Sequence, residues 1–177
     1  MKRGGKQSKD RFIFVINKCD EFDPEKGESI DDLLNEVKKY LNNYGIEEPN
    51  LFPVSAQIAK LIRMSRNGKE FTKKEKGELE CKVGYFNDLE GYHFEKRSSL
   101  SESCKLNIEN KLKKTKENSD IYTEALIHTG IPCIEESINE YLEKYAYPIK
   151  IKDAIKEFNE VIEEKSMKLN LVEKLAD

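Results

Sequence analysis

Residues 11–23, RFIFVINKCDEFD, contain an apolar run that ends abruptly in polar and charged side chains. Residues 12–16 are a continuous β-branched and aromatic run, which is typical of a strand covered on both faces in a parallel sheet. Asn17, Lys18 and Asp20 come at once after this run. The stretch therefore predicts a buried strand with an amide, an ammonium group and a carboxylate at its carboxyl end.

The segment after this strand predicts a helix. Ser29 can cap that helix, with Asp31 and Asp32 in its first turn, where carboxylates interact favourably with the helix dipole. Apolar residues then recur at helical spacing as far as Tyr44, and Gly45 supplies the stop. We therefore expect one amphipathic helix between the strand and the next apolar segment.

That next segment, LFPVSA at residues 51–56, predicts a second short strand. Strand, helix and strand form one right-handed crossover unit of a parallel sheet. Ligands of such sheets bind at the carboxyl ends of the strands, where residues 17–20 end the first strand and Ser55 and Ala56 end the second. The two polar ends are therefore expected at one edge of the sheet.

The composition limits the classes of function. The chain has 177 residues, 37% of them charged and 37% hydrophobic, with a formal net charge of -3. This balance argues against a general nucleic-acid binder, which needs a basic face. No window approaches the length of an apolar transmembrane segment, and the basic residues at the start precede no hydrophobic region of a signal peptide. We therefore expect a cytoplasmic protein.

The motifs at the strand ends resemble a known family. NKCD, residues 17–20, matches the Asn-Lys-x-Asp guanine-recognition motif of P-loop GTPases, and VSA, residues 54–56, matches the Ser-Ala motif of the same fold. HTGIP, residues 128–132, leads into an amphipathic pattern containing Tyr-Leu, similar to the last helix of the GTPase domain in dynamin-like proteins. The chain thus resembles the dynamin-like GTPases of bacterial type.

The resemblance implies a role for each residue of the motifs. Asp20 would accept hydrogen bonds from the guanine N1–H and amine, because one carboxylate can take two neighbouring donors. Asn17 would donate to the purine while its carbonyl ties back to a neighbouring loop, and Lys18 would lay its stem over the base. The backbone N–H of Ala56 could reach the guanine O6, with the small Ser55 permitting the approach. Adenine would leave groups of this site unpaired.

The fold class that the resemblance implies is α/β and mostly helical. It is an incomplete P-loop GTPase, or Rossmann-like, domain with two parallel strands, a helical insertion and a C-terminal neck helix. Residues 1–60 and 120–147 would form the guanine-binding half, residues 61–119 the insertion and residues 148–177 the neck. The parent protein would couple GTP hydrolysis to membrane remodelling or assembly.

The phosphate-binding elements of that family are missing from the sequence. There is no G-x-x-x-x-G-K-[ST] and no Asp-x-x-Gly after a strand, and Gly4 and Gly5 resemble a loop before the strand. We therefore predict weak GTP or GDP binding, no hydrolysis by this chain alone, no catalytic residue, and Mg²⁺ only in a complete parent domain. The chain would be a truncated gene product, one piece of a split protein or a deliberately shortened chain. Its partner would be the missing half of the domain or a second copy, with a membrane surface reached only through the parent.

The C-terminal segment supports an alternative function. Apolar residues step by fours and threes in a nearly heptad pattern that Lys165 interrupts. The pattern comprises Ile151, Ile155, Phe158, Ile162, Leu169 and Val172. A helix with such a stripe needs a partner, either other helices of a longer chain or a second copy. The alternative is a helical interaction protein that binds no nucleotide.

Residues 57–120 predict helices separated by loops. Apolar spacing predicts a helix from Ile58 to Met64, Thr72 with Glu75 a capping box, and residues 100–116 another helix. Residues 65–71 and 88–99 have the composition of loops. Two strands alone leave faces and edges open, so we expect marginal stability or self-association unless this insertion covers the exposed edge of the first strand.

The cysteines and histidines show no ligand spacing. Cys19, Cys81, Cys104 and Cys133 are widely separated, which favours free, buried or half-buried thiols. His93 and His128 stand apart in the sequence and receive no role. We therefore expect no metal site.

Overall fold

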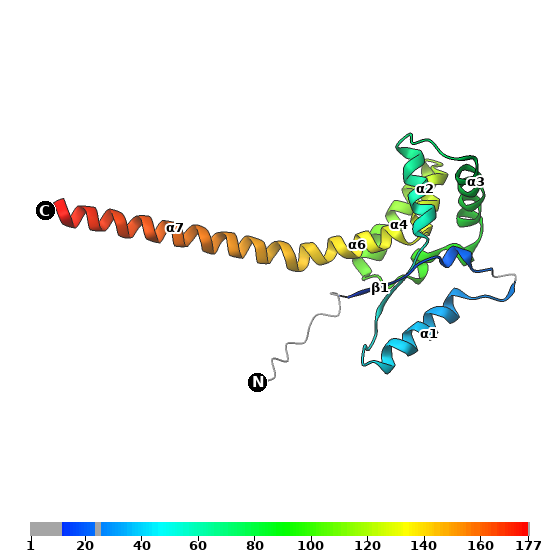
Figure 1. Ribbon diagram of the computed structural model, residues 1–177, viewed down its shortest axis with the longest axis horizontal. Coiled ribbons are helices and arrows are strands. Elements are labelled where there is room, and N and C mark those ends of the chain that lie inside the picture. Colours follow the sequence, from blue (N-terminus) through cyan, green and yellow to red (C-terminus); the bar gives the residue numbers. More distant parts are fainter. Residues whose placement is uncertain (1–11, 24–25, 177) are drawn as a thin grey trace. The chain divides into compact units, whose positions relative to one another are not determined.

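The computed structural model describes residues 12–23 and 26–176, and the surroundings of side chains as far as residue 163 (Figure 1). Gly4 and Gly5 lie outside the described residues. The chain divides into two compact units, residues 1–138 and 139–177. The described residues are mostly helical with two parallel strands, which confirms the α/β, mostly helical class.

The two strands form a small parallel sheet. β1 (Ile13–Ile16) pairs with β2 (Asn50–Pro53), so that Ile13 lies opposite Asn50 and Ile16 opposite Pro53. The pairing continues past the strand ends, because the Val54 N–H donates to the Ile16 carbonyl over 2.8 Å. Together these bonds hold the carboxyl ends of the two strands side by side.

The crossover helix α1 (Ile30–Asn43) connects the strands as predicted. The Ser29 hydroxyl accepts a hydrogen bond from the Asp32 N–H over 3.2 Å, which is the expected cap. Gly45 follows the helix with a φ of 80°, in the left-handed region that favours glycine.

Two expectations about the strands are wrong. β1 is not covered on both faces, since 49% of Val15 is exposed; a sheet of two strands has too few neighbours to enclose it. The second strand ends at Pro53 rather than Ala56, because Ala56 already begins helix α2 (Ala56–Arg66).

The insertion pairs with β2 instead of covering the edge of β1. Ser99 donates its N–H to the Leu51 carbonyl over 2.9 Å, and its hydroxyl accepts from the Leu51 N–H over 3.0 Å. The free edge of β2 is thereby satisfied, and β2 is correspondingly buried from Leu51 to Pro53.

Three helices of the insertion region follow the predicted pattern. α2 contains the expected helix at Ile58 to Met64, and α3 (Lys73–Asp88) begins with a complete capping box between Thr72 and Glu75. α4 (Glu102–Glu117) corresponds to the helix predicted at residues 100–116. It is followed by a further short helix, α5 (Ile121–His128).

The segment 88–99 differs from the loop that its composition indicates. It forms two 3₁₀ helices, η4 (Glu90–Tyr92) and η5 (Phe94–Arg97), and much of it is buried. Tyr92 and Phe94 are the cause, since both rings pack edge to face on Phe86 with centroids 5.6 and 5.5 Å away. Two aromatic anchors outweigh the polar composition around them.

The core of the first unit consists of two clusters. The larger joins α2, α3, η4, η5 and α5 and contains Ile58, Leu61, Ile62, Leu79, Val83, Phe86, Tyr92, Phe94, Ala125 and Leu126 among its buried residues. The smaller one packs β2 against α4, α5 and the start of α6, through Phe52, Val54, Ile108, Ile127 and Cys133. β2 and its continuation therefore belong to the smaller cluster.

Gly130 fixes the junction between α5 and α6 (Ile131–Tyr141). Its φ is 77°, and a Cβ placed on it would lie 2.3 Å from the Pro53 carbonyl oxygen. Only glycine permits both the conformation and this approach of two backbones. Pro132 lies in the first turn of α6, where its missing N–H removes no hydrogen bond of the helix.

The second unit, residues 139–177, is helical throughout its described part. A π-helical turn (Leu142–Ala146) leads into α7 (Tyr147–Ala176). The apolar stripe predicted for this helix is exposed at Ile151, Ile155, Phe158 and Ile162, by 46 to 66%. Lys165, Leu169 and Val172 lie beyond the side chains that the structure describes. Among the described helices, none combines the length and the apolar character needed to cross a membrane.

Candidate strand-end site

The five residues predicted to read guanine come together at the carboxyl edge of the sheet. We call Asn17, Lys18, Asp20, Ser55 and Ala56 the strand-end site. The first three follow β1, and the other two follow β2. The Asn17 Oδ1 accepts a hydrogen bond from the Ala56 N–H over 3.1 Å, which links the two motifs directly.

This bond gives Asn17 the tie to a neighbouring loop that its predicted role requires. It also engages the Ala56 N–H, the group expected to reach the guanine O6. Asn17 itself is exposed, so its amide is oriented by the bond while remaining open to solvent. A base in this site could accept a hydrogen bond from the Asn17 side-chain amide. It would have to compete with the Asn17 side-chain carbonyl for the Ala56 N–H.

Lys18 turns the chain at this edge. Its φ of 67° is in the left-handed region, which is uncommon for a residue with a side chain. The following 3₁₀ helix η2 (Cys19–Glu21) points Lys18 outward, where its ammonium pairs with Glu21 over 3.2 Å and 72% of its side chain is exposed. The Cys19 N–H donates to the Val54 carbonyl over 3.1 Å and holds this turn against the second strand.

Asp20 lies on the buried side of the turn. It is only 8% exposed, and its Oδ2 is 3.4 Å from the ammonium of Lys82 in α3. Lys82 also donates to the backbone carbonyl of Asp20. The insertion thus supplies the cation that neutralises Asp20, and a guanine base would share this carboxylate with Lys82 or displace it.

Ser55 connects the strand-end site to the third motif. It is fully buried, and its N–H donates to the Thr129 carbonyl over 3.0 Å. The Ser55 hydroxyl makes no hydrogen bond within the described protein. NKCD, VSA and HTGIP are therefore joined by three hydrogen bonds: two between NKCD and VSA, at Asn17–Ala56 and Cys19–Val54, and one between VSA and HTGIP, at Ser55–Thr129.

A hollow of about 720 Å³ opens beside Asp20 and Lys82. Its lining combines aromatic and acidic side chains, including Tyr85, Tyr92 and Asp88. Neither Asn17 nor Ala56 lines it. The hollow next to the carboxylate is thus on the side of the insertion.

The cysteines are free thiols, as predicted, and Cys19, Cys104 and Cys133 are buried. The prediction is wrong for Cys81, which is exposed. Burial raises the pKa of the Cys19 thiol to about 11, and its Sγ donates to the Ile16 carbonyl over 3.2 Å. Burial also raises the pKa of Cys133 to about 12. These thiols therefore stay protonated at neutral pH and serve as small apolar side chains.

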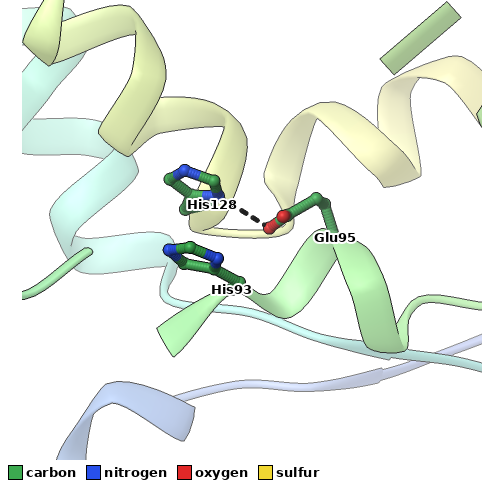
Figure 2. Close-up of side chains that lie close together, drawn as sticks. All are labelled: His93, Glu95 and His128. Carbon is green, nitrogen blue, oxygen red and sulfur yellow. Dashed lines mark ion pairs between the residues drawn. The ribbon is translucent and has the colours of Figure 1, made fainter. Parts of the chain in front are cut away.

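The two histidines, which the sequence leaves apart and without a role, are stacked on each other (Figure 2). The ring centroids of His93 and His128 are 3.8 Å apart at an interplanar angle of 6°, and His128 Nδ1 is 2.9 Å from Glu95 Oε2. We call His93, Glu95 and His128 the histidine cluster.

Local spacing held a signal for this cluster. Glu95 is two residues after His93, and Glu124 is one helical turn before His128. Treating both histidines as isolated was therefore wrong. The stacking of His93 on His128, 35 positions apart, could not be predicted from the sequence, because it depends on how η5 packs on α5.

Comparisons with protein-family models, with curated proteins and with solved structures find no match to this chain.

Proposed function

We propose that this chain is the guanine-recognising half of a dynamin-like GTPase, whose parent couples GTP hydrolysis to membrane remodelling or assembly. The observation that carries the proposal is the hydrogen bond between Asn17 Oδ1 and the Ala56 N–H. Two short motifs far apart in the sequence meet there, at the edge where parallel sheets bind ligands.

The chemistry at this edge suits guanine better than adenine. The Asp20 carboxylate can accept from two adjacent donors, the N1–H and the amine of guanine. The Asn17 amide, oriented by its carbonyl, can donate to the purine, and the exposed stem of Lys18 can cover the base. Adenine offers neither donor to the carboxylate, so it could not replace the Lys82 ammonium that a base has to displace.

Lys82 weakens this binding, because it already pairs with Asp20. Its ammonium lies 3.4 Å from the Asp20 carboxylate, and 22% of its side chain is exposed. A base that takes both carboxylate oxygens has to move Lys82 into solvent. The free energy of binding therefore depends on the difference between the interaction of Asp20 with guanine and its interaction with Lys82.

The sequence contains no P-loop motif, so it lacks the loop that binds the nucleotide phosphates in P-loop GTPases. Base contacts alone leave the phosphate charge to solvent, so binding of GTP or GDP is weak. Mg²⁺ and hydrolysis belong to the complete parent domain, as does any contact with a membrane surface. Substantial Mg²⁺-dependent GTP turnover by the purified chain would contradict this.

The test compares GDP and ADP by isothermal titration calorimetry with the wild type and Asp20→Asn. The amide of the variant offers one acceptor and no charge, so we expect GDP affinity to fall by about tenfold or more, with ADP binding weaker than GDP binding in the wild type. Asp153→Asn, the same change on the exposed part of α7, serves as a matched control with unchanged GDP affinity. Equal binding of GDP and ADP, or no effect of Asp20→Asn, would overturn the guanine assignment.

A second candidate function, a helical interaction protein without nucleotide binding, is favoured by a separate observation. The stripe of Ile151, Ile155, Phe158 and Ile162 on α7 is exposed, and such a stripe needs a partner. Light scattering of the wild type and Phe158→Glu would test a partner that is a second copy. A concentration-dependent dimer lost in the variant, together with absent GDP binding, would favour this function.

A further inference from the structure

The histidine cluster gathers three ligand-type side chains in the core. His93 lies between η4 and η5, Glu95 lies in η5, and His128 ends α5. One potential ligand atom from each residue lies within 4.8 Å of those of the other two. Figure 2 shows the Glu95 carboxylate pointing toward the edge of the His128 ring, with His93 stacked below that ring. No residue of this cluster belongs to the strand-end site.

His93 is a buried polar group that lacks a protein partner. The residue is 9% exposed, and neither ring nitrogen makes a hydrogen bond within the described protein. A neutral imidazole carries one N–H donor and one acceptor nitrogen, and burying both unpaired is unfavourable. Because buried polar groups in folded proteins almost always have a partner, this ring calls for an ion or a water.

Carboxylates lie near both ring nitrogens of His128, and neither contact is a hydrogen bond. Its Nδ1 is 2.9 Å from Glu95 Oε2, and its Nε2 is 3.9 Å from Glu124 Oε1. Histidine ligands of metals commonly direct the second ring nitrogen to a carboxylate, which fixes the ring. With Nδ1 toward the cluster, Glu124 is placed to take that orienting role.

We propose that His93, Glu95 and His128 form a binding site for Zn²⁺. Two imidazole nitrogens and one carboxylate oxygen are ligands that zinc accepts, with one position left for water. Glu95 supplies negative charge inside a buried site, and Glu124 adds a second carboxylate beside it. A divalent cation would satisfy the unpaired nitrogen of His93 and the Glu95 carboxylate together.

Binding requires a small movement of the rings. Ligand atoms of tetrahedral zinc lie about 3.4 Å apart, given metal–ligand distances near 2.1 Å. The lone pairs of two parallel rings point in parallel directions, so one ring has to turn about its Cβ–Cγ bond to share an ion. This torsion has a broad energy minimum, so the cost of the turn lies in giving up the stacked packing of the two rings.

The test uses the full chain, stripped of metals with a chelator and titrated with Zn²⁺ by calorimetry. The expected result is a stoichiometry near one per chain and a raised melting temperature. Co²⁺ used as a probe should give the visible absorption of a low-coordinate site. His93→Phe keeps a ring stacked on His128 but removes its nitrogens, and Glu95→Gln keeps the size but removes the charge. Each variant should weaken Zn²⁺ by about tenfold or more, while circular dichroism reports whether it folds.

Two controls separate this site from adventitious binding. Glu36→Gln makes the same change at an exposed position of α1, and Cys81→Ser removes the exposed thiol. Both should bind Zn²⁺ as the wild type does. No saturable heat with folded protein, or binding that His93→Phe leaves unchanged, would overturn the proposal. The inference does not rest on the proposed function, since Zn²⁺ and GDP binding are measured separately.

Discussion

The strand-end site and the histidine cluster differ in how their residues are distributed along the sequence. In the strand-end site, each functional group sits within a few residues of a strand end, and the resemblance is carried by short motifs. In the histidine cluster, two rings 35 positions apart meet only because η5 packs on α5. The first arrangement is exposed at Asn17 and Lys18 and is held by a hydrogen bond to the backbone, whereas the second is buried and contains an unpaired ring. A site built from short sequence motifs can thus be predicted from the sequence, whereas a site created by tertiary packing cannot.

The largest effect is expected at the junction that both regions share. At Gly130 a Cβ would lie 2.3 Å from the Pro53 carbonyl oxygen and 3.2 Å from the Phe94 Cβ, at a φ of 77°. Gly130→Ala should therefore lower the free energy of unfolding by roughly 2–4 kcal/mol, since neither backbone can give way without moving β2 or η5. Urea denaturation measures this change.

The matched control is Gly77→Ala in α3, where a Cβ meets nothing within 4 Å. Alanine has the higher helix propensity, so this variant should gain about 0.5–1 kcal/mol. A tolerated Gly130→Ala would show that the strand-end site and the histidine cluster are not held by one junction.

The buried cysteines should differ in reactivity from the exposed one. Burial raises the pKa of Cys19 beside the strand-end site to about 11 and that of Cys133 in the smaller core cluster to about 12. Because the thiolate is the reactive form, and only roughly one Cys19 thiol in a thousand is ionised near pH 8, both should react with iodoacetamide at least about 100-fold more slowly than the exposed Cys81.

Mass spectrometry of the labelled peptides gives the rate at each position. Rapid labelling of Cys19 alone would mean that the turn after β1 opens independently of the core. Rapid labelling of Cys133 would place the same opening at the start of α6 instead.

The smallest effect concerns Lys82. Removing its ammonium in Lys82→Ala frees the Asp20 carboxylate, so GDP affinity should rise by roughly three- to tenfold, as expected for a partly exposed ion pair. Lys76→Ala, on the exposed face of the same helix, is the control. Weaker GDP binding in Lys82→Ala would mean that Lys82 supports Asp20 rather than competing for it.

Much of the fold was predictable because its signals are local. The cap at Ser29, the capping box at Thr72 and the stop at Gly45 each depend on a few neighbouring residues, and all three are present. The exposure of Val15 was not predictable, since an apolar run does not tell how many strands will flank it. The burial of residues 92–95 was missed because the packing of Tyr92 and Phe94 on Phe86 is a tertiary event.

The same distinction applies to the strand-end site. Its members could be named from motifs and strand ends, and so could the tie between Asn17 and a neighbouring loop. The pairing of Asp20 with Lys82 could not, because it depends on how α3 docks against η2.

Two-dimensional amide NMR of the chain with GDP and with ADP would show whether the strand-end site binds guanine. We expect GDP to shift the resonances of Lys18, Asp20, Ser55 and Ala56, together with the Asn17 side-chain amide, and ADP at the same concentration to leave them in place. Equal shifts with both nucleotides, or GDP-induced shifts confined to other parts of the chain, would contradict it.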